Sequence, residues 1–265
     1  MKKILTAFSA IDTPWHVINF ATRIAKENSA VIQAVFLNME KESVNEDYPF
    51  PNDLSITEDK NTFENISDNN NELVEENIKL FKKECDRSGI SFSATKNISI
   101  PDLINETADV DLMMADSGTE FLEKVLPEIH CPAFLASRDE LPENVVLMYN
   151  NTPSSKFAIE SYLSLLPQFK DLPTFLLCIN PGNTAEKEMN IYLKETLEPH
   201  FTNLTLKSIH GKTEHEMKNF LLAFSGHVVV VMGAFGRSSF SRFFHESLAN
   251  LALSLKNISL FIAHK

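Results

Sequence analysis

Residues 144–167, NVVLMYNNTPSSKFAIESYLSLLP, decide the fold, because residues 2–25, KKILTAFSAIDTPWHVINFATRIA, repeat their pattern. Each stretch begins with a short apolar strand and continues through a loop that ends in Thr-Pro. A segment with apolar residues at three- and four-residue spacing follows, which predicts a helix. Thr13-Pro14 and Thr152-Pro153 occupy the same place in the two stretches. Such self-similarity indicates that the chain contains two copies of one structural unit.

Predicted strands and helices alternate through the rest of each copy. The later strands match in pairs: VIQAVFLN (31–38) with PTFLLCIN (173–180), DLMMADS (111–117) with HVVVVMG (227–233), and PAFLAS (132–137) with ISLFIAHK (258–265). Strands that are separated by helices pair in parallel, and the helices then cover both faces of the sheet.

The sequence therefore predicts an α/β protein with two tandem, doubly wound, Rossmann-like domains, each containing a five-stranded parallel sheet. We place them at residues 1–140 and 141–265, joined near 138–143. Two similar halves in one chain often pack as an internal pseudo-dimer, and the apolar last strands are the expected meeting edges. We expect two separate sheets there and not one continuous sheet of ten strands.

Residues 40–76 depart from this regular pattern. They contain 12 Asp or Glu and 2 Lys or Arg, and so carry −10 of the net charge of −12. Their many Asn, Asp, Glu and Ser residues predict a solvated insertion over about 40–71, before a helix begins near Glu72. Such an insertion is either tolerated at the surface or functional, and the sequence leaves both readings open.

Composition excludes several classes of protein. Charges outside the acidic segment nearly balance, so no basic face is available for nucleic acid. No apolar run approaches the ~18–20 residues needed to span a bilayer. The three cysteines, Cys85, Cys131 and Cys178, lack any paired spacing, which argues against a disulfide framework or a zinc site and fits a reducing cytoplasm. We therefore expect a cytoplasmic protein with no membrane partner.

Residues 231–247, VMGAFGRSSFSRFFHES, hold two of the 7 glycines in the chain. Gly233 and Gly236 follow a run of four valines. A Gly-x-x-Gly turn at a strand end lets backbone N–H groups converge on a phosphate, and the N-terminus of the next helix adds partial positive charge. Arg237, Ser238 and Ser239 add a cation and two hydroxyl donors. Taken alone, the same spacing also fits an ordinary tight turn between a strand and a helix.

Together, the repeated unit, the Thr-Pro-Ser-Ser helix start and the VMGAFGRSS turn resemble the universal stress protein family in its tandem form. The resemblance covers the chain apart from the acidic insertion and is strongest over 144–265. It implies a non-catalytic regulatory protein of the stress response that binds ATP or a related nucleotide, with no metal beyond nucleotide-bound Mg. Nucleotide-binding members carry an Asp after strand one. After strand four they carry Gly, two residues, Gly, nine residues, Gly, then Ser or Thr. The nucleotide-binding residues implied here are Asn150, Met232, Gly233, Gly236, Arg237, Ser238 and Ser247.

The chain departs from the family pattern at several of these places. Glu246 stands where the third glycine is expected, which blocks close backbone approach and places a carboxylate near any phosphate. Asn150 replaces the Asp, which keeps hydrogen-bonding capacity but loses the charge. In the first copy the corresponding position lies near Phe8, and residues 116–124 contain no Gly-x-x-Gly. The resemblance thus implies that the first site is lost and that the second is half present.

Other residue patterns are weaker. His210, Glu214 and His215 form HGKTEH, a spacing that could hold a metal, but no third ligand is apparent and a helix start explains it more simply. No Ser-His-Asp order or Walker-type motif appears, so we expect no catalytic residues. Two functions remain. One is a nucleotide-binding regulatory protein, and the other is an interaction protein that binds no nucleotide and meets its protein partner through its pseudo-dimer surface or acidic insertion. A homodimer is compatible with either.

Overall fold

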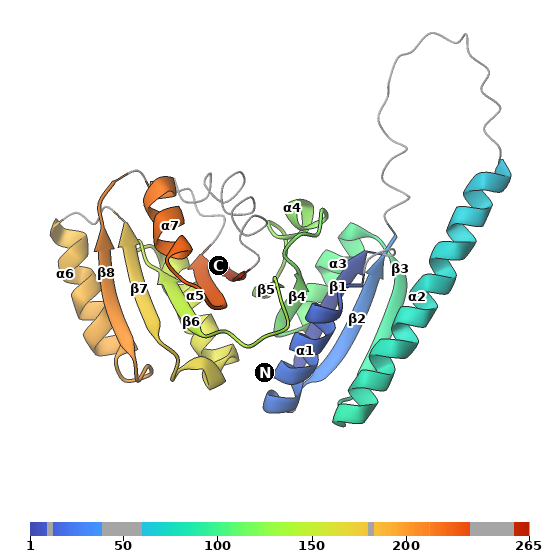
Figure 1. Ribbon diagram of the computed structural model, residues 1–265, viewed down its shortest axis with the longest axis horizontal. Coiled ribbons are helices and arrows are strands. Elements are labelled where there is room, and N and C mark those ends of the chain that lie inside the picture. Colours follow the sequence, from blue (N-terminus) through green and yellow to red (C-terminus); the bar gives the residue numbers. More distant parts are fainter. Residues whose placement is uncertain (10–12, 39–59, 180–182, 212, 234–256, 265) are drawn as a thin grey trace, which may run out of the picture.

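The computed structural model describes residues 1–9, 13–38, 60–179, 183–211, 213–233 and 257–264. The first half runs β1 (Lys3–Ser9), α1 (Trp15–Asn28), β2 (Val31–Leu37), α2 (Lys60–Ser88), β3 (Phe92–Ile98), α3 (Ile100–Glu106), η2 (Thr107–Asp109), β4 (Leu112–Asp116), α4 (Leu122–Val125) and β5 (Ala133–Ala136). The second half runs β6 (Asn144–Met148), α5 (Pro153–Leu165), η3 (Pro167–Phe169), β7 (Thr174–Ile179), α6 (Asn183–Tyr192), η4 (Leu193–Leu197), β8 (Leu204–Ile209), α7 (Thr213–Leu222), β9 (Val228–Gly233) and β10 (Ile258–Ala263). Apart from the short η helices, the two halves share the order strand, helix, strand, helix, strand, helix, strand, and each ends in a further strand, β5 or β10 (Figure 1).

All ten strands form one sheet, in the order β3-β2-β1-β4-β5-β10-β9-β6-β7-β8. Within each half the strands are parallel and follow the predicted doubly wound order. The halves meet through their last strands, as predicted, but β5 and β10 form an antiparallel ladder over Ala133–Leu135 and Leu260–Ile262. Our prediction of two separate sheets was therefore wrong. Each last strand leaves unpaired backbone N–H and C=O groups at its edge, and hydrogen bonding between these edges satisfies them.

Two apolar layers cover the two faces of this sheet. One layer lies under α1, α2, α5 and α6, and the other lies under α3, α4 and α7. Successive strand residues alternate between the layers: Ile4 and Phe8 face the first, whereas Leu5 and Ala7 face the second. Both layers contain residues from both halves, so the core is continuous across the β5–β10 junction.

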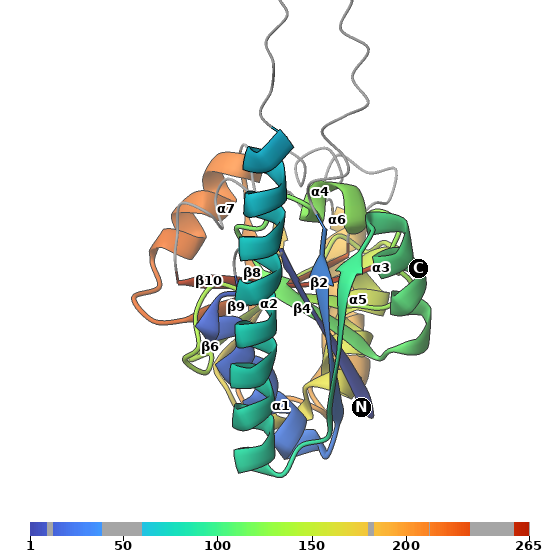
Figure 2. The same cartoon turned by 90° about the vertical axis from the view of Figure 1, so that its right-hand side faces the viewer.

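Helix α2 begins twelve residues before the predicted start near Glu72. It spans Lys60–Ser88, 29 residues, and its first turns extend past the end of β3 (Figures 1 and 2). Val74, Phe81 and Cys85 are buried against the sheet. Because these contacts anchor the helix, its extension into the polar segment adds turns to an existing nucleus at little cost per residue. Residues 39–59 of the predicted insertion lie outside the described structure.

Candidate functional site

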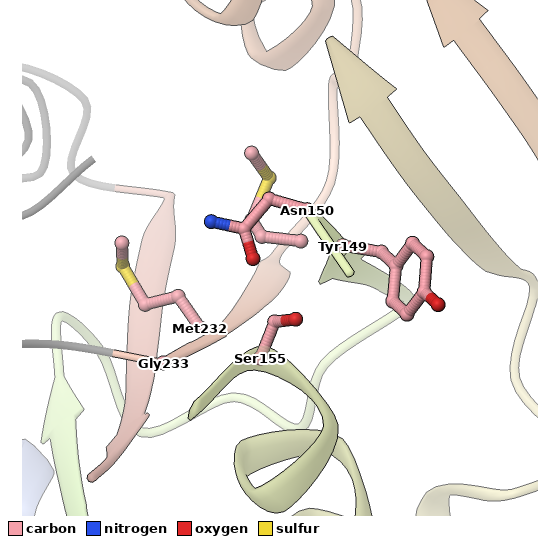
Figure 3. A pocket seen from close by; sticks show the side chains of 6 residues that line it. Tyr149, Asn150, Ser155, Met232 and Gly233 are labelled. Carbon is pink, nitrogen blue, oxygen red and sulfur yellow. The ribbon is translucent and has the colours of Figure 1, made fainter. Parts of the chain in front are cut away.

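The carboxyl ends of β6 and β9 lie side by side at the topological switch point of the second half. β6 lies between β9 and β7, and its residues Asn144–Leu147 pair with Val228–Val231. Ligands of doubly wound sheets bind beyond the strand ends at such a point. A small cavity opens here, and Figure 3 shows the residues that line it: Met148, Tyr149, Asn150, Ser155, Met232 and Gly233. The structure thus brings together three of the predicted site residues, Asn150, Met232 and Gly233.

Gly233 lies against the first turn of α5. A Cβ atom placed on Gly233 would lie 2.5 Å from the backbone C and O atoms and from Oγ of Ser154. Carbon atoms in ordinary contact stay about 3.5–4.0 Å apart, so no larger residue fits without a backbone shift. Glycine at this position therefore lets the end of β9 touch the N-terminus of the helix, which is where backbone N–H groups are unpaired.

Polar side chains fix the start of α5. Thr152 is the N-cap, and its Oγ1 accepts a hydrogen bond from the backbone N–H of Ser155 at 3.2 Å. Asn150 in turn accepts two hydrogen bonds at Oδ1, from the backbone N–H of Thr152 at 3.3 Å and from its hydroxyl at 2.6 Å. Figure 3 shows the amide oxygen of Asn150 on the side of Ser155 and the amide nitrogen on the side away from Tyr149. Asn150 therefore orients the loop with its oxygen and presents a donor to the cavity.

The cavity itself is small. Its volume is about 10 Å³, which is room for about one water molecule. A nucleoside does not fit inside it, so a ligand of that size would have to lie farther out, above Asn150 and Gly233. Four of the predicted contacts, Gly236, Arg237, Ser238 and Ser247, lie outside the described residues, as does Glu246.

Aromatic residues support the β6 side of the site, and our sequence reasoning missed them. The Tyr149 ring stacks on Tyr192 with centroids 5.1 Å apart, and its hydroxyl donates to Oδ1 of Asn151 at 2.8 Å. Asn151 has a left-handed backbone with φ of 59° and also donates to Glu188. Burial raises the pKa of Tyr149 to about 12, so this donor stays neutral. The available signal was the large aromatic residue immediately before Asn150.

The ladder at the junction shows which residues of the two halves correspond. Phe134 of β5 pairs with Phe261 of β10, and these two residues also pair with Met114 of β4 and Val231 of β9. Met114 and Val231 face the same apolar layer. Counting two residues onward along β4 and β9 matches Asp116 with Gly233.

The corresponding site in the first half is occupied by its own side chains. Nε2 of His16, in the first turn of α1, lies 2.7 Å from Oδ2 of Asp116 and 3.3 Å from the carbonyl oxygen of Ala136. The hydrogen bond to Asp116 is the largest of the effects that raise the pKa of His16. In the first half, the ion pair of His16 and Asp116 therefore occupies the place that Gly233 and the start of α5 occupy in the second half.

Phe8 is not the counterpart of Asn150. Thr6 pairs with Met114 in the first half as Leu147 pairs with Val231 in the second. Thr6 therefore corresponds to Leu147. Two and three residues further on, Phe8 corresponds to Tyr149 and Ser9 to Asn150. Phe8 is buried in the core, with ring centroids 5.4 Å from Phe36 and 6.0 Å from Phe81. The counterpart of Asn150 therefore lies one residue beyond Phe8, because Lys3 and not Lys2 corresponds to Asn144 in the paired strands.

Other predicted features can be placed as well. Cys85, Cys131 and Cys178 are buried and form no disulfide with one another. No group of three or more His, Cys, Asp or Glu within the described residues could hold a metal ion. Nε2 of His215, from the HGKTEH stretch, is instead 2.9 Å from Nδ2 of Asn219. None of the helices in the described segments is long and apolar enough to cross a membrane.

The fold matches that of solved universal stress protein structures over nearly the whole chain. A universal stress protein from Archaeoglobus fulgidus gives a TM-score of 0.67 at 11% identity, covering 99% of this chain and 96% of that one. A putative universal stress protein from Pseudomonas aeruginosa gives 0.62 at 12% identity, covering 99% and 93%. A functionally unknown protein from Pseudomonas aeruginosa gives 0.59 at 11% identity, covering 99% and 92%. No protein-family model and no curated protein matches the sequence. The likeness therefore establishes the universal stress protein fold.

Proposed function

We propose that the chain is a tandem universal stress protein that acts in the cytoplasm as a non-catalytic regulator and holds ATP or a related nucleotide in its second half. The observation that carries this proposal is Gly233, where a strand end at the switch point touches a helix N-terminus and no side chain fits. Such close backbone approach is what phosphate-binding turns require. The sequence then supplies Gly236, Arg237 and Ser238 directly after this position.

The proposed binding is asymmetric, with one nucleotide per chain. In the first half the equivalent of Gly233 is Asp116, whose carboxylate is 2.7 Å from His16. A phosphate there would have to displace the Asp116 carboxylate from His16, and without that partner two like charges ~4 Å apart repel by ~1 kcal/mol in water and by more at lower effective dielectric. A nucleotide in the second half meets no such charge among the described residues that line the cavity.

An interaction protein that binds no nucleotide is the second candidate function. Two observations favour it: the cavity holds about 10 Å³, and Oδ1 of Asn150 is already engaged by Thr152. In that case Gly233 serves only to pack β9 against α5, and the chain acts through a surface that meets another protein.

Titration calorimetry with ATP distinguishes the two functions. We expect one site per chain, at least about tenfold weaker binding in Asn150→Ala, and unchanged binding in the matched first-half variant Ser9→Ala. Asn150→Asp keeps an oxygen acceptor for Thr152 and replaces the amide donor by a carboxylate oxygen, so it preserves the loop and changes only the group that faces the ligand. Absence of any binding heat from the wild type up to millimolar ATP would favour the interaction protein, and two equivalent sites per chain would contradict the asymmetry.

A further inference from the structure

Helix α2 lies along the outer end of the sheet, beside the edge strand β3 (Figures 1 and 2). Its inner side is buried against the core through three residues: Val74, Phe81 and Cys85. On one flank Asn77 donates a hydrogen bond to Oγ1 of Thr13 at 3.0 Å, just before α1. On the other flank Nζ of Lys96 in β3 donates to the Glu75 carboxylate at 2.6 Å. The remaining side of the helix faces outward.

Two large apolar residues stand on the outward side of α2. Leu73 is 47% exposed and Leu80 is 38% exposed. They are seven residues apart, which is close to two helical turns, so they lie in line on one face of the helix. A single exposed leucine is ordinary on a protein surface, whereas apolar residues at this spacing form the contact line of paired helices. We call Leu73 and Leu80 the leucine stripe.

Four charged residues follow the leucine stripe on the side away from the core, and all are exposed: Glu72, Glu76, Lys79 and Lys83. Their spacings of four, three and four residues place them in one row along the helix. The two carboxylates come first in this row and the two ammonium groups follow. Within the described residues, none of the four takes part in an ion pair. Each like-charged pair is instead four residues apart, a spacing at which like charges on a helix repel each other.

An antiparallel pair of α2 helices from two copies of the chain brings the leucine stripe into contact with itself. A twofold axis between two helices makes the same surface patch meet on both sides. When this axis passes near Asn77, Leu73 of each copy lies opposite Leu80 of the other. The exposed leucines, two from each copy, are then removed from water, which supplies the hydrophobic part of the association.

The charged row fits the same arrangement. Both rows lie on the same side of the antiparallel pair, so the acidic half of one row faces the basic half of the other. Glu76 of one copy faces Lys79 of the second copy. Glu72 faces Lys83 of the second copy with the same offset of about 3 Å along the helix axis. A parallel pair would set carboxylates against carboxylates, which repel, so the row selects the antiparallel orientation.

We propose that the chain forms a homodimer through α2, in which the two helices are antiparallel, the leucine stripes are in contact and the charged rows pair with each other. This surface is separate from the edges of β5 and β10, which already join the two halves within one chain. One pair of helices makes a small interface compared with those of stable complexes. The homodimer is therefore weak, with a dissociation constant in the micromolar range.

Sedimentation velocity on the full-length chain at low salt tests the homodimer, over protein concentrations of about 1–200 μM. We expect a monomer–dimer equilibrium in the wild type and association at least about tenfold weaker in Leu73→Gln/Leu80→Gln. The matched control is Leu222→Gln, which replaces a leucine on α7 that is 52% exposed, and it should dimerise as the wild type does. All of these side chains are exposed, so circular dichroism and Tm should show folded variants.

Charge reversal tests the orientation of the two helices. Glu72→Lys/Glu76→Lys makes the row basic throughout, and Lys79→Glu/Lys83→Glu makes it acidic throughout. Each variant alone should associate about tenfold or more weakly at low salt, with a smaller loss as salt rises. An equimolar mixture of the two should form a heterodimer. The fourfold variant, which carries all four changes, exchanges the two halves of the row and should dimerise as the wild type does.

Three results would overturn the proposal. The first is a wild type that stays monomeric up to about 200 μM, well above a micromolar dissociation constant. The second is a homodimer that Leu73→Gln/Leu80→Gln leaves unchanged, because it would use another surface. The third is a charge-reversed variant that associates with itself as tightly as the wild type at low salt.

Discussion

Substitution of Gly233 by alanine tests whether the close contact between β9 and α5 is real. A Cβ atom at this position lies 2.5 Å from the backbone C and O of Ser154 and from its Oγ. Gly233 is not among the described glycines with positive φ, so alanine meets no backbone strain of that kind. Where no clash exists, Gly→Ala stabilises by about 0.4–1 kcal/mol through the unfolded state. Whether Gly233→Ala raises or lowers stability therefore depends only on the contact between the new Cβ atom and Ser154.

We expect Gly233→Ala to destabilise the chain. Overpacking of a well-packed site costs about 1–3 kcal/mol and the entropic gain is about 0.4–1 kcal/mol, so the middle of the two ranges gives a net loss of about 1–2 kcal/mol. For a chain of this size that corresponds to a fall in Tm of roughly 2–8 °C. The measurement is thermal and urea unfolding of wild type and variant, with an unchanged urea m value as the sign that only stability has changed.

The double variant Gly233→Ala/Ser154→Ala is the matched control. It removes Oγ of Ser154 but leaves the backbone C and O atoms at 2.5 Å from the new Cβ. Most of the loss should therefore persist. A Gly233→Ala protein as stable as wild type, or full rescue by Ser154→Ala, would refute the close backbone contact on which the site depends.

Three further substitutions have predictable outcomes. Asp116→Asn should lower Tm more at about pH 5.5 than at about pH 8.5. The pair with His16 stabilises the fold fully below about pH 6.5, and this stabilisation is lost as pH rises through the raised pKa of His16. A larger loss of Tm at the higher pH would contradict this. Thr152→Ala should cost about 1 kcal/mol in urea unfolding through loss of the N-cap bond to Ser155, and no change would argue against that cap. Glu246→Gly, at a position outside the described residues, should strengthen ATP binding about tenfold or more in calorimetry, and unchanged affinity would remove the role that the family resemblance implies.

The local pattern of the sequence was sufficient to predict the α/β class, the repeat and most strands. Apolar runs of strand length, separated by segments of helical period, require a parallel order with helices on both faces. The same reasoning placed Gly233 at the carboxyl end of a strand, whereas Asn150 was placed beside it by the resemblance to the universal stress protein family. These features depend on spacing along the chain, and spacing is visible in the sequence.

The sequence predicted that the halves meet at their last strands, but only the tertiary structure decided that they join there in one antiparallel ladder and what fills their equivalent sites. The ladder between β5 and β10, the His16–Asp116 pair and the bond between Ser137 and Ser259 all connect residues that are far apart in sequence; the last pair is separated by 122 positions. No periodicity marks such contacts, since each depends on the register of several strands at once. A one-residue difference in register moves a side chain to the other face of the sheet. For that reason Phe8, near which the sequence placed the counterpart of Asn150, lies in the core, and Ser9 takes that place.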